Sequence, residues 1–259
     1  MGFRASRPSL DGSLRDSALE FLAGAGHNTL ESDLYRMGWN PVVTAEDYAH
    51  DSAHRLHVAT ASSTALAGGT IAADIAAEQD KVRRADAVVL QFPLWWFSMP
   101  AIMKGWVDRV FVEGFGYGIR KAEGGTRRYG DGLMAGTRAL VVTSMGGSEH
   151  TVSARGINGS LDELLFPIQH GFFWYTGMAV LPPVLIPSAD RMTEDGYAAA
   201  EAHLQARLGT LFSDEPIPYR HQSNGQYDRN FVLRSPYAVG EEGLRVHTAP
   251  PSHAAQSSA

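Results

Sequence analysis

Residues 85–100 read "ADAVVLQFPLWWFSMP", and this stretch decides which class of fold the chain can adopt. Its first half, 85–92, is a continuous apolar run that follows helical spacing of apolar residues between Ile71 and Val82. Such a run after a helix is typical of a parallel strand buried on both faces. Its second half, 93–100, which we call the aromatic loop, holds two tryptophans and a phenylalanine between two prolines. Loops usually lie at the surface and large rings are usually buried, so this loop should contact something flat or apolar.

Helices and further strands alternate along the rest of the chain. Residues 137–144, "TRALVVTS", are a second candidate for a buried strand, and residues 178–186 begin as a third. Ser160 and Thr193 are the expected N-caps of the last two helices, and Pro167 should kink the helix in which it lies. Apolar residues at helical spacing predict helices over 9–26, 71–84, 100–111, 160–177 and 193–211.

The pattern as a whole predicts an α/β fold. Its other expected segments are a short strand at 27–34, a mobile loop at 49–69 and a long loop rich in glycine at 114–136. Strands that alternate with helices form a doubly wound parallel sheet with helices on both faces. After Ser213 the composition shifts to proline, glycine and polar residues. We therefore expect one domain over 1–212 and a C-terminal arm or tail over 213–259.

Composition and charge exclude several classes of protein. The 259 residues are 44% hydrophobic and 19% charged, as in ordinary globular proteins, and the formal net charge is −6. No basic cluster exceeds two adjacent arginines, so we expect no nucleic-acid partner. The chain has no cysteine, which excludes disulfides, cysteine-ligated metal clusters and thiol catalysis. It has neither a signal peptide nor an apolar run of about 18 residues, so we expect a cytoplasmic protein without membrane insertion.

The loops after the two buried strands are where a ligand is expected. In a doubly wound sheet ligands bind at the carboxyl ends of the strands, which lead here into the aromatic loop and into "TSMGGS" at 143–148, the Gly-Gly loop. Glycines let backbone amides approach a ligand closely, and aromatic rings offer a flat surface, so the pair suits a planar ring system. Two other interpretations stay open. Trp95, Trp96 and Phe97 could pack in the core, and the two glycines could form a tight turn.

Other motifs that carry chemistry are incomplete in this sequence. "GAGHNT" at 24–29 begins like a dinucleotide-binding motif, but it lacks the third glycine and ends a helix instead of following a strand. Neither a phosphate-binding P-loop nor a G-x-S-x-G nucleophile motif occurs. His50, His54 and His57 have the spacing of one helix face, but they lie in an expected loop, so we expect no metal site.

A long stretch around the aromatic loop resembles a known enzyme family. Residues 74–118, "DIAAEQDKVRRADAVVLQFPLWWFSMPAIMKGWVDRVFVEGFGYG", are similar to the NAD(P)H:quinone oxidoreductases of the flavodoxin-like fold, the family of DT-diaphorase and the bacterial modulator of drug activity. The resemblance extends from about Ser9 to Tyr219 and includes "GINGSLDELLFPIQHGFFWYTG" at 156–177. It implies a non-covalently bound FAD, a homodimer with its active site at the subunit interface, and ping-pong hydride transfer from NAD(P)H to a quinone.

The resemblance also implies which residues would hold the flavin and the quinone. The start of the first helix would receive the phosphates of the cofactor, and the two loops would hold its isoalloxazine ring. These residues are Ser9, Leu10 and Asp11 at the helix start, Pro93, Leu94, Trp95, Trp96 and Phe97 in the aromatic loop, and Ser144, Met145, Gly146 and Gly147 in the Gly-Gly loop. Tyr117, Trp96 and Phe97 would line the quinone pocket.

Three departures from the family pattern concern the site and the fold. Val152 and Asn158 stand where the family has a tyrosine and a histidine, so Asn158 and the nearby His150 are the candidates for a catalytic role. Tyr197 replaces an arginine near the adenine end of the cofactor. Family members begin with a buried strand that ends in a histidine, whereas this chain begins "MGFRASRPS" with Arg4 at that position. We therefore expect the first strand to be truncated.

Residues and resemblance together predict a flavin-dependent NAD(P)H dehydrogenase. It would transfer two electrons from NAD(P)H through FAD to a quinone or a similar acceptor. The alternative enzyme uses FMN and reduces azo or nitro compounds. The alternative from a different class is a non-catalytic, flavin-binding regulatory subunit of a transporter, because the family's tyrosine and histidine are replaced.

Overall fold

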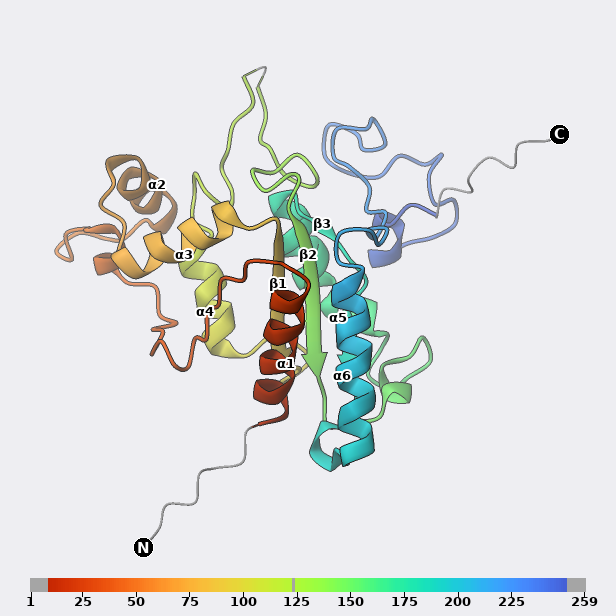
Figure 1. The fold of residues 1–259 in the computed structure, drawn as a ribbon. Helices are drawn as coiled ribbons and strands as arrows, with labels where there is room; N and C mark the ends of the chain where they lie inside the picture. The colour runs from red at the N-terminus through yellow and green to blue at the C-terminus, as the bar shows by residue number, and fades with distance from the viewer. Residues whose placement is uncertain (1–8, 123, 251–259) are drawn as a thin grey trace, which may run out of the picture.

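The computed structural model describes residues 9–122 and 124–250, and its strands form one parallel sheet (Figure 1). The strands are β1 (Ala87–Pro93), β2 (Arg138–Ser144), β3 (Ala179–Val180) and β4 (Val184–Ile186). β1 pairs with β2 along its whole length. β3 pairs with the first two residues of β2, and β4 pairs with its last three. β2 is therefore the central strand, and the three strands predicted within residues 85–186 are confirmed. The expectation that the strand at 85–92 is buried on both faces is wrong, because Val88, Leu90 and Phe92 are buried whereas Val89, on the other face of β1, is 37% exposed.

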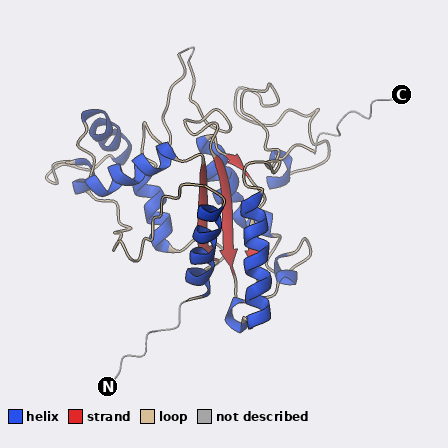
Figure 2. Cartoon of the chain, viewed as in Figure 1, coloured by secondary structure: helices blue, strands red, loops and turns tan. Residues whose placement is uncertain are grey.

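The central strand is apolar because helices cover both of its faces (Figure 2). The α-helices of the described residues are α1 (Leu10–Gly24), α2 (Val58–Gly68), α3 (Ala73–Arg84), α4 (Ala101–Val110), α5 (Leu161–Ile168) and α6 (Glu194–Gly209). Leu140 and Val142 pack with α1 and α6, which lie in front of the sheet in Figure 1. Ala139 and Val141 belong to the other core, with α3, α4 and α5. Alternate side chains point to opposite faces, so both must be apolar, and the doubly wound fold is confirmed.

The helix predicted over 160–177 changes its geometry half-way. The Ser160 hydroxyl accepts a hydrogen bond from the Glu163 amide at 3.3 Å, and the Glu163 carboxylate accepts one from the Ser160 amide at 3.1 Å, a complete capping box. Pro167 has no N–H to donate, and directly after α5 the chain continues as the π-helix η3 (Gln169–Trp174). The cap is confirmed, and the irregularity at Pro167 is a change from α to π geometry. The described residues also form short 3₁₀ helices, which are η1 (Ala45–Tyr48), η2 (Glu149–Val152), η4 (Ala189–Arg191) and η5 (Leu244–His247).

The prediction of a mobile loop at 49–69 is wrong over its second half, where α2 forms. This segment is rich in alanine, the strongest helix former. Ser62 and Ala65 are buried, and the Ser62 hydroxyl donates to the Ala59 carbonyl at 3.0 Å inside the helix. Small and polar residues therefore form a packed helix here, because their hydroxyl groups are satisfied by the helix itself.

The short strand predicted at 27–34 is also wrong. These residues join no ladder, and Leu30 is 45% exposed. A strand is stable only beside a paired neighbour, and among the described residues β1 pairs with β2 alone. The expectation of a truncated first strand concerns residues 1–8, which lie outside the described residues.

Residues 213–250 have little regular structure and pack beside β3 and the loop that contains Tyr129. The Ile217 amide donates to the Val180 carbonyl of β3 at 2.7 Å, and the Arg220 guanidinium donates to the Val246 carbonyl at 2.8 Å. The boundary predicted at residue 212 stays a prediction. None of the helices in the described part of the chain has the length and apolarity needed to cross a bilayer.

Candidate functional site

β1 and β2 end side by side, and three segments meet at that edge of the sheet. The Leu94 amide, in the aromatic loop, donates to the Ser144 carbonyl at 2.7 Å, where the Gly-Gly loop begins. The third segment is the start of α1, because the Ser144 hydroxyl donates to the Asp11 carboxylate at 3.0 Å. The sequence pattern assigned the two loops to one ligand, the family resemblance added the start of α1, and the structure brings the three segments together.

The aromatic loop presents its rings to solvent on a strained backbone. The Trp95 amide donates to the Pro93 carbonyl at 2.9 Å and the Ser98 amide to the Trp95 carbonyl at 3.1 Å, which closes a tight turn. Trp96 and Phe97 have left-handed φ angles of 49° and 62°. That region costs a non-glycine residue about 1–2 kcal/mol. Trp96 is 93% exposed, so the interpretation of this ring as core packing is wrong. Exposed large rings on a strained turn indicate a ligand or a partner that covers them.

The Gly-Gly loop is held through its carbonyls, which leaves its amides available. The Ser188 amide, beyond β4, donates to the Gly147 carbonyl at 2.8 Å. The amides of Gly146, Gly147 and Ser148 have no acceptor within residues 9–122 and 124–250. A side chain at Gly146 would collide with the carboxylate of Asp190. The loop is therefore a row of hydrogen-bond donors, and a larger residue at position 146 would have to displace the Asp190 carboxylate.

α1 begins at the same edge with donors of its own. The Ser9 hydroxyl accepts from the Gly12 amide at 3.1 Å, whereas the amides of Leu10 and Asp11 have no acceptor in the described part of the chain. Unpaired amides and the helix dipole make such a terminus attractive to anions. Burial raises the pKa of the Asp11 carboxyl group, and the hydrogen bond from Ser144 lowers it in part. When Asp11 is ionised, its carboxylate places a negative charge at this helix terminus.

Comparisons with known proteins agree on one family. Residues 4–208 match a family described as having the flavodoxin-like fold. The chain is 42% identical over 222 residues to the ribosyldihydronicotinamide dehydrogenase-like protein traD of Penicillium crustosum, which covers 85% of this chain and 82% of that protein. It is 33% identical over 229 residues to NAD(P)H dehydrogenase (quinone) 1 of Rattus norvegicus, with 88% and 81% covered. The chain belongs to the NAD(P)H:quinone oxidoreductase family.

A solved structure agrees with this assignment. The structure of a candidate quinone reductase from Klebsiella pneumoniae superimposes with a TM-score of 0.90 at 44% identity, covering 95% of this chain and 97% of that one. The resemblance of residues 74–118 to the quinone oxidoreductase family is thus confirmed.

The three segments fit the flavin that this oxidoreductase family implies. One edge of an isoalloxazine ring carries carbonyl oxygens and ring nitrogens, which accept hydrogen bonds from amides such as those of the Gly-Gly loop. Its faces are flat and apolar, like the rings of the aromatic loop. Its phosphates match the start of α1. The residue-by-residue assignment stays a prediction.

Tyr117, predicted to line the quinone pocket of this family, does not lie with the two loops. α4 leads from the aromatic loop back towards the other end of the sheet (Figure 1). Tyr117 comes after α4 in the sequence. There the Gly114 amide donates to the Tyr117 carbonyl at 2.7 Å. Tyr117 is therefore separated from Trp96 and Phe97 within one chain.

The candidates for catalysis lie directly after the Gly-Gly loop. Val152 is buried, so the position where the family has a tyrosine contributes to the core. The Asn158 amide donates to the Thr151 carbonyl at 3.0 Å, which returns Asn158 to η2. His150 is exposed, and its amide donates to the Ser148 hydroxyl at 3.3 Å. Both candidates thus stay near the loop, and only His150 could transfer a proton at neutral pH.

Two residues of this edge were missed by the sequence reasoning. Asp190, in η4, lies over Gly146, and Ile157 is almost fully exposed in the turn before Asn158. Asp190 could have been found, because the rule that ligands bind beyond the carboxyl ends of strands also applies to the strand predicted to start at 178. Ile157 had no such signal.

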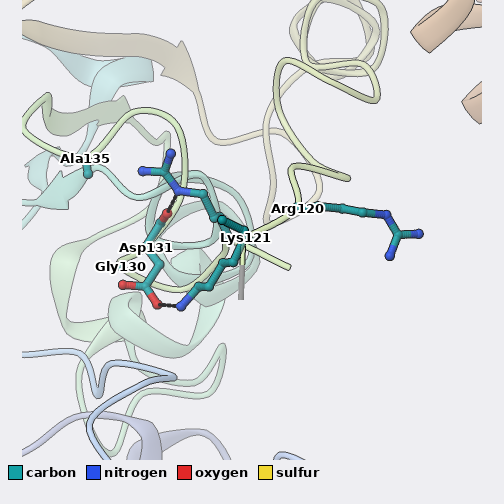
Figure 3. A pocket seen from close by; sticks show the side chains of 7 residues that line it. Arg120, Lys121, Gly130, Asp131 and Ala135 are labelled. Carbon is teal, nitrogen blue, oxygen red and sulfur yellow. Dashed lines mark hydrogen bonds and ion pairs between the residues drawn. The ribbon is translucent and has the colours of Figure 1, made fainter. Parts of the chain in front are cut away.

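Two other features lie away from this edge. The His54 ring is 3.8 Å from the Asp51 carboxylate, and no three potential metal ligands come together among the described residues. A cavity of about 400 Å³ lies in the long loop beyond α4. It is lined by Arg120, Lys121, Ala122, Arg127, Gly130, Asp131 and Ala135 (Figure 3). Lys121 is paired with Asp131 at 2.7 Å, and Arg120 extends away from them in Figure 3, so the positive charges of this cavity do not converge.

Proposed function

We propose that this chain is a flavin-dependent NAD(P)H dehydrogenase that reduces quinones, with FAD as its cofactor. The observation that carries the proposal is that unpaired backbone amides of two segments, the Gly-Gly loop and the start of α1, meet beside the exposed rings of the aromatic loop. Two relatives support the reaction, since one is named a ribosyldihydronicotinamide dehydrogenase-like protein and the other an NAD(P)H dehydrogenase (quinone).

The residues of the chain would bind and orient the reacting molecules. When bound, the flavin supplies the chemistry, taking a hydride from NAD(P)H and passing two electrons to the acceptor. Amides of the Gly-Gly loop would donate to the edge of the ring on which negative charge develops. Trp96 and Phe97 would cover the substrate slot and exclude water from it. Asn158 would donate a hydrogen bond without transferring a proton.

The finer features of the proposal follow the family resemblance. We infer FAD, with FMN as the alternative, because the family that the chain resembles holds FAD. Tyr197, which replaces the family's arginine near the adenine end, donates its hydroxyl to the Glu201 carboxylate at 3.2 Å, and its ring would offer a surface for stacking. A cytoplasmic location is proposed because NAD(P)H is available in that compartment.

A homodimer with the site at its interface is also part of the proposal. α4 separates Tyr117 from the aromatic loop of its own chain, so it would line the quinone slot as Tyr117 of the partner subunit. The exposed rings of the aromatic loop are further support, because a second subunit would cover them. Sedimentation analysis of the purified chain tests this, and a monomer that turns over quinone at full rate would contradict it.

Steady-state kinetics test the function itself. The purified chain is reconstituted with FAD or with FMN, and NADH or NADPH oxidation is followed with and without menadione. We expect menadione-dependent oxidation that is faster with FAD, and parallel lines in double-reciprocal plots, as a ping-pong mechanism requires. Flavin binding without turnover would instead favour the non-catalytic regulatory subunit.

A further inference from the structure

One acidic residue connects the start of α1 to both strands at the site. The Asp11 carboxylate accepts the hydroxyl hydrogen bond of Ser144, at the end of β2. The carbonyl of Asp11 accepts a hydrogen bond from the Gln91 side chain of β1 at 2.7 Å. These two contacts fix the carboxyl group beside the unpaired amides of the first helical turn.

The groups around Asp11 leave its charge without a cation among the described residues. β1 and β2 contribute Gln91 and Ser144, which are neutral. On α1 itself, Arg15 is engaged by acidic side chains other than Asp11, namely Asp16, Glu31 and Asp33. α6, which packs on α1, contributes Tyr197 and Glu201. The chain after β4 adds Asp190, another acid, over Gly146.

This arrangement bears on the cofactor because the same helix start is where phosphates are expected. A carboxylate there repels a phosphate group and competes with it for the helix dipole, whereas a protonated carboxyl group does neither and can donate a hydrogen bond. Burial, which raises the pKa of Asp11, brings its protonation closer to the pH of ordinary solutions.

We propose that Asp11 controls flavin affinity through its protonation, so that the chain binds FAD more tightly as the pH falls. The proposal rests on the flavin-binding function proposed above. An anion bound nearby favours the protonated carboxyl group, so the pKa of Asp11 is higher in the complex than in the flavin-free protein. FAD affinity is therefore greatest below both values and decreases as the pH rises through them.

FAD titrations of the flavin-free full-length chain test the proposal. FAD is the better probe, because the pyrophosphate of FAD does not titrate in the range used, whereas a phosphate monoester such as FMN has a pKa of about 6. Quenching of flavin fluorescence gives the dissociation constant between about pH 5 and about pH 8. For the wild type we expect binding about tenfold weaker at the high end, the size of one partly screened charge interaction.

Three variants separate Asp11 from other titrating groups. Asp11→Asn should bind FAD tightly across the range, with the pH dependence removed. Ser144→Ala should shift the weakening to higher pH, because the hydroxyl that stabilises the ionised carboxylate is gone. Glu20→Gln is the matched control, an exposed acid on the same helix that no described segment of the site includes, and should keep the wild-type profile.

The outcomes distinguish this inference from the proposed function. A wild-type affinity that is constant with pH, or a pH dependence that persists in Asp11→Asn, overturns the role of Asp11. An Asp11→Asn variant that binds FAD more weakly than the wild type at every pH also overturns it. Failure of every variant to bind FAD at any pH contradicts the flavin-binding function instead.

Discussion

The aromatic loop and the Gly-Gly loop leave neighbouring strands at the same edge, yet they are built in opposite ways. In the aromatic loop, large side chains are exposed and the backbone at Trp96 and Phe97 is strained. In the Gly-Gly loop positions 146 and 147 have no side chain, and the chain after β4 holds the backbone through hydrogen bonds to the carbonyls of Met145 and Gly147. One loop thus offers surface and the other offers oriented donors.

The difference shows how one sheet edge can combine two requirements of a flat, polar-edged ligand. Apolar faces need rings that can lie against them, and these rings stay exposed until the ligand covers them. Polar edges need donors fixed in advance, because donors that must first be oriented lose affinity. Strain is therefore expected in the loop that carries rings, and rigidity in the loop that carries amides.

The largest expected effect concerns the fold on which both loops depend. Burial, and then the charge of His247, lower the pKa of His170 to about 4. The native state therefore binds fewer protons than the unfolded chain, so His170 contributes stability above pH 6.5 that is lost as the pH falls towards 4. The loss is about 3 kcal/mol at most. Urea unfolding at pH 7 and at pH 4.5 measures it, and His170→Phe, which can stack between Phe166 and Tyr129, should reduce the difference. An unchanged acid sensitivity in that variant would assign it to other groups.

Flavin retention compares the two loops directly. Trp96→Ala removes a ring that would cover the flavin, and Gly147→Val crowds the donor row, so each should weaken binding by about 2 kcal/mol, or about thirtyfold. The φ of Gly147 is not in the left-handed region, and the atom nearest to an added side chain is the flexible end of Met145 at 3.0 Å, so Gly147→Val should still fold. Flavin per chain after gel filtration is the readout. Full retention in both variants would show that the flavin binds elsewhere.

In the aromatic loop, one substitution should raise the stability of the flavin-free protein and lower its affinity for flavin. Trp96→Gly relieves a left-handed backbone and removes a side chain with almost no buried surface, so the flavin-free protein should gain about 1 kcal/mol. Its flavin affinity should still fall. Gly147→Ala, the counterpart in the Gly-Gly loop, should change stability by less than about 0.5 kcal/mol. Equilibrium urea unfolding decides, and a destabilised Trp96→Gly would mean that its ring is packed in solution.

How far the sequence predicts these features depends on whether they are local. The apolar runs at 85–92 and 137–144 predicted neighbouring parallel strands, and β2 is buried on both faces as expected, whereas β1 is buried mainly on one face. α2 was missed because its small residues give no apolar periodicity, although their helix propensity is high. The strand predicted at 27–34 failed because a strand depends on a neighbour that its own sequence does not encode.

Parts of the site were predictable from the order of strands and loops, and parts were not. The two loops follow neighbouring parallel strands, so their place at one edge followed from topology. The left-handed angles at Trp96 and Phe97 could not be predicted, because they depend on how the turn closes. The distance of Tyr117 from the loops was hidden for a different reason. The family resemblance assigns its residues to one site, whichever subunit supplies them.

The smallest expected effect tests whether the segment after the Gly-Gly loop contributes a proton or only hydrogen bonds. Asn158 cannot transfer a proton, so the rate of flavin reduction should show no break between about pH 6 and about pH 7. His150→Ala should accordingly change that rate by less than about twofold. Stopped-flow measurements with NADPH provide the profile. A break that disappears in His150→Ala would give His150 the acid–base role.

The central claim, that the two loops hold a flavin which passes electrons from NAD(P)H to a quinone, is tested most directly by one anaerobic titration. The chain, reconstituted with FAD and freed of unbound flavin, is mixed with NADPH and then with menadione while its visible absorbance is recorded. We predict that the flavin bands of the wild type bleach on addition of NADPH and return on addition of menadione, and that Trp96→Ala and Gly147→Val retain little absorbance. A wild-type chain that holds no flavin, or whose flavin bands do not respond to NADPH or NADH, would contradict this account.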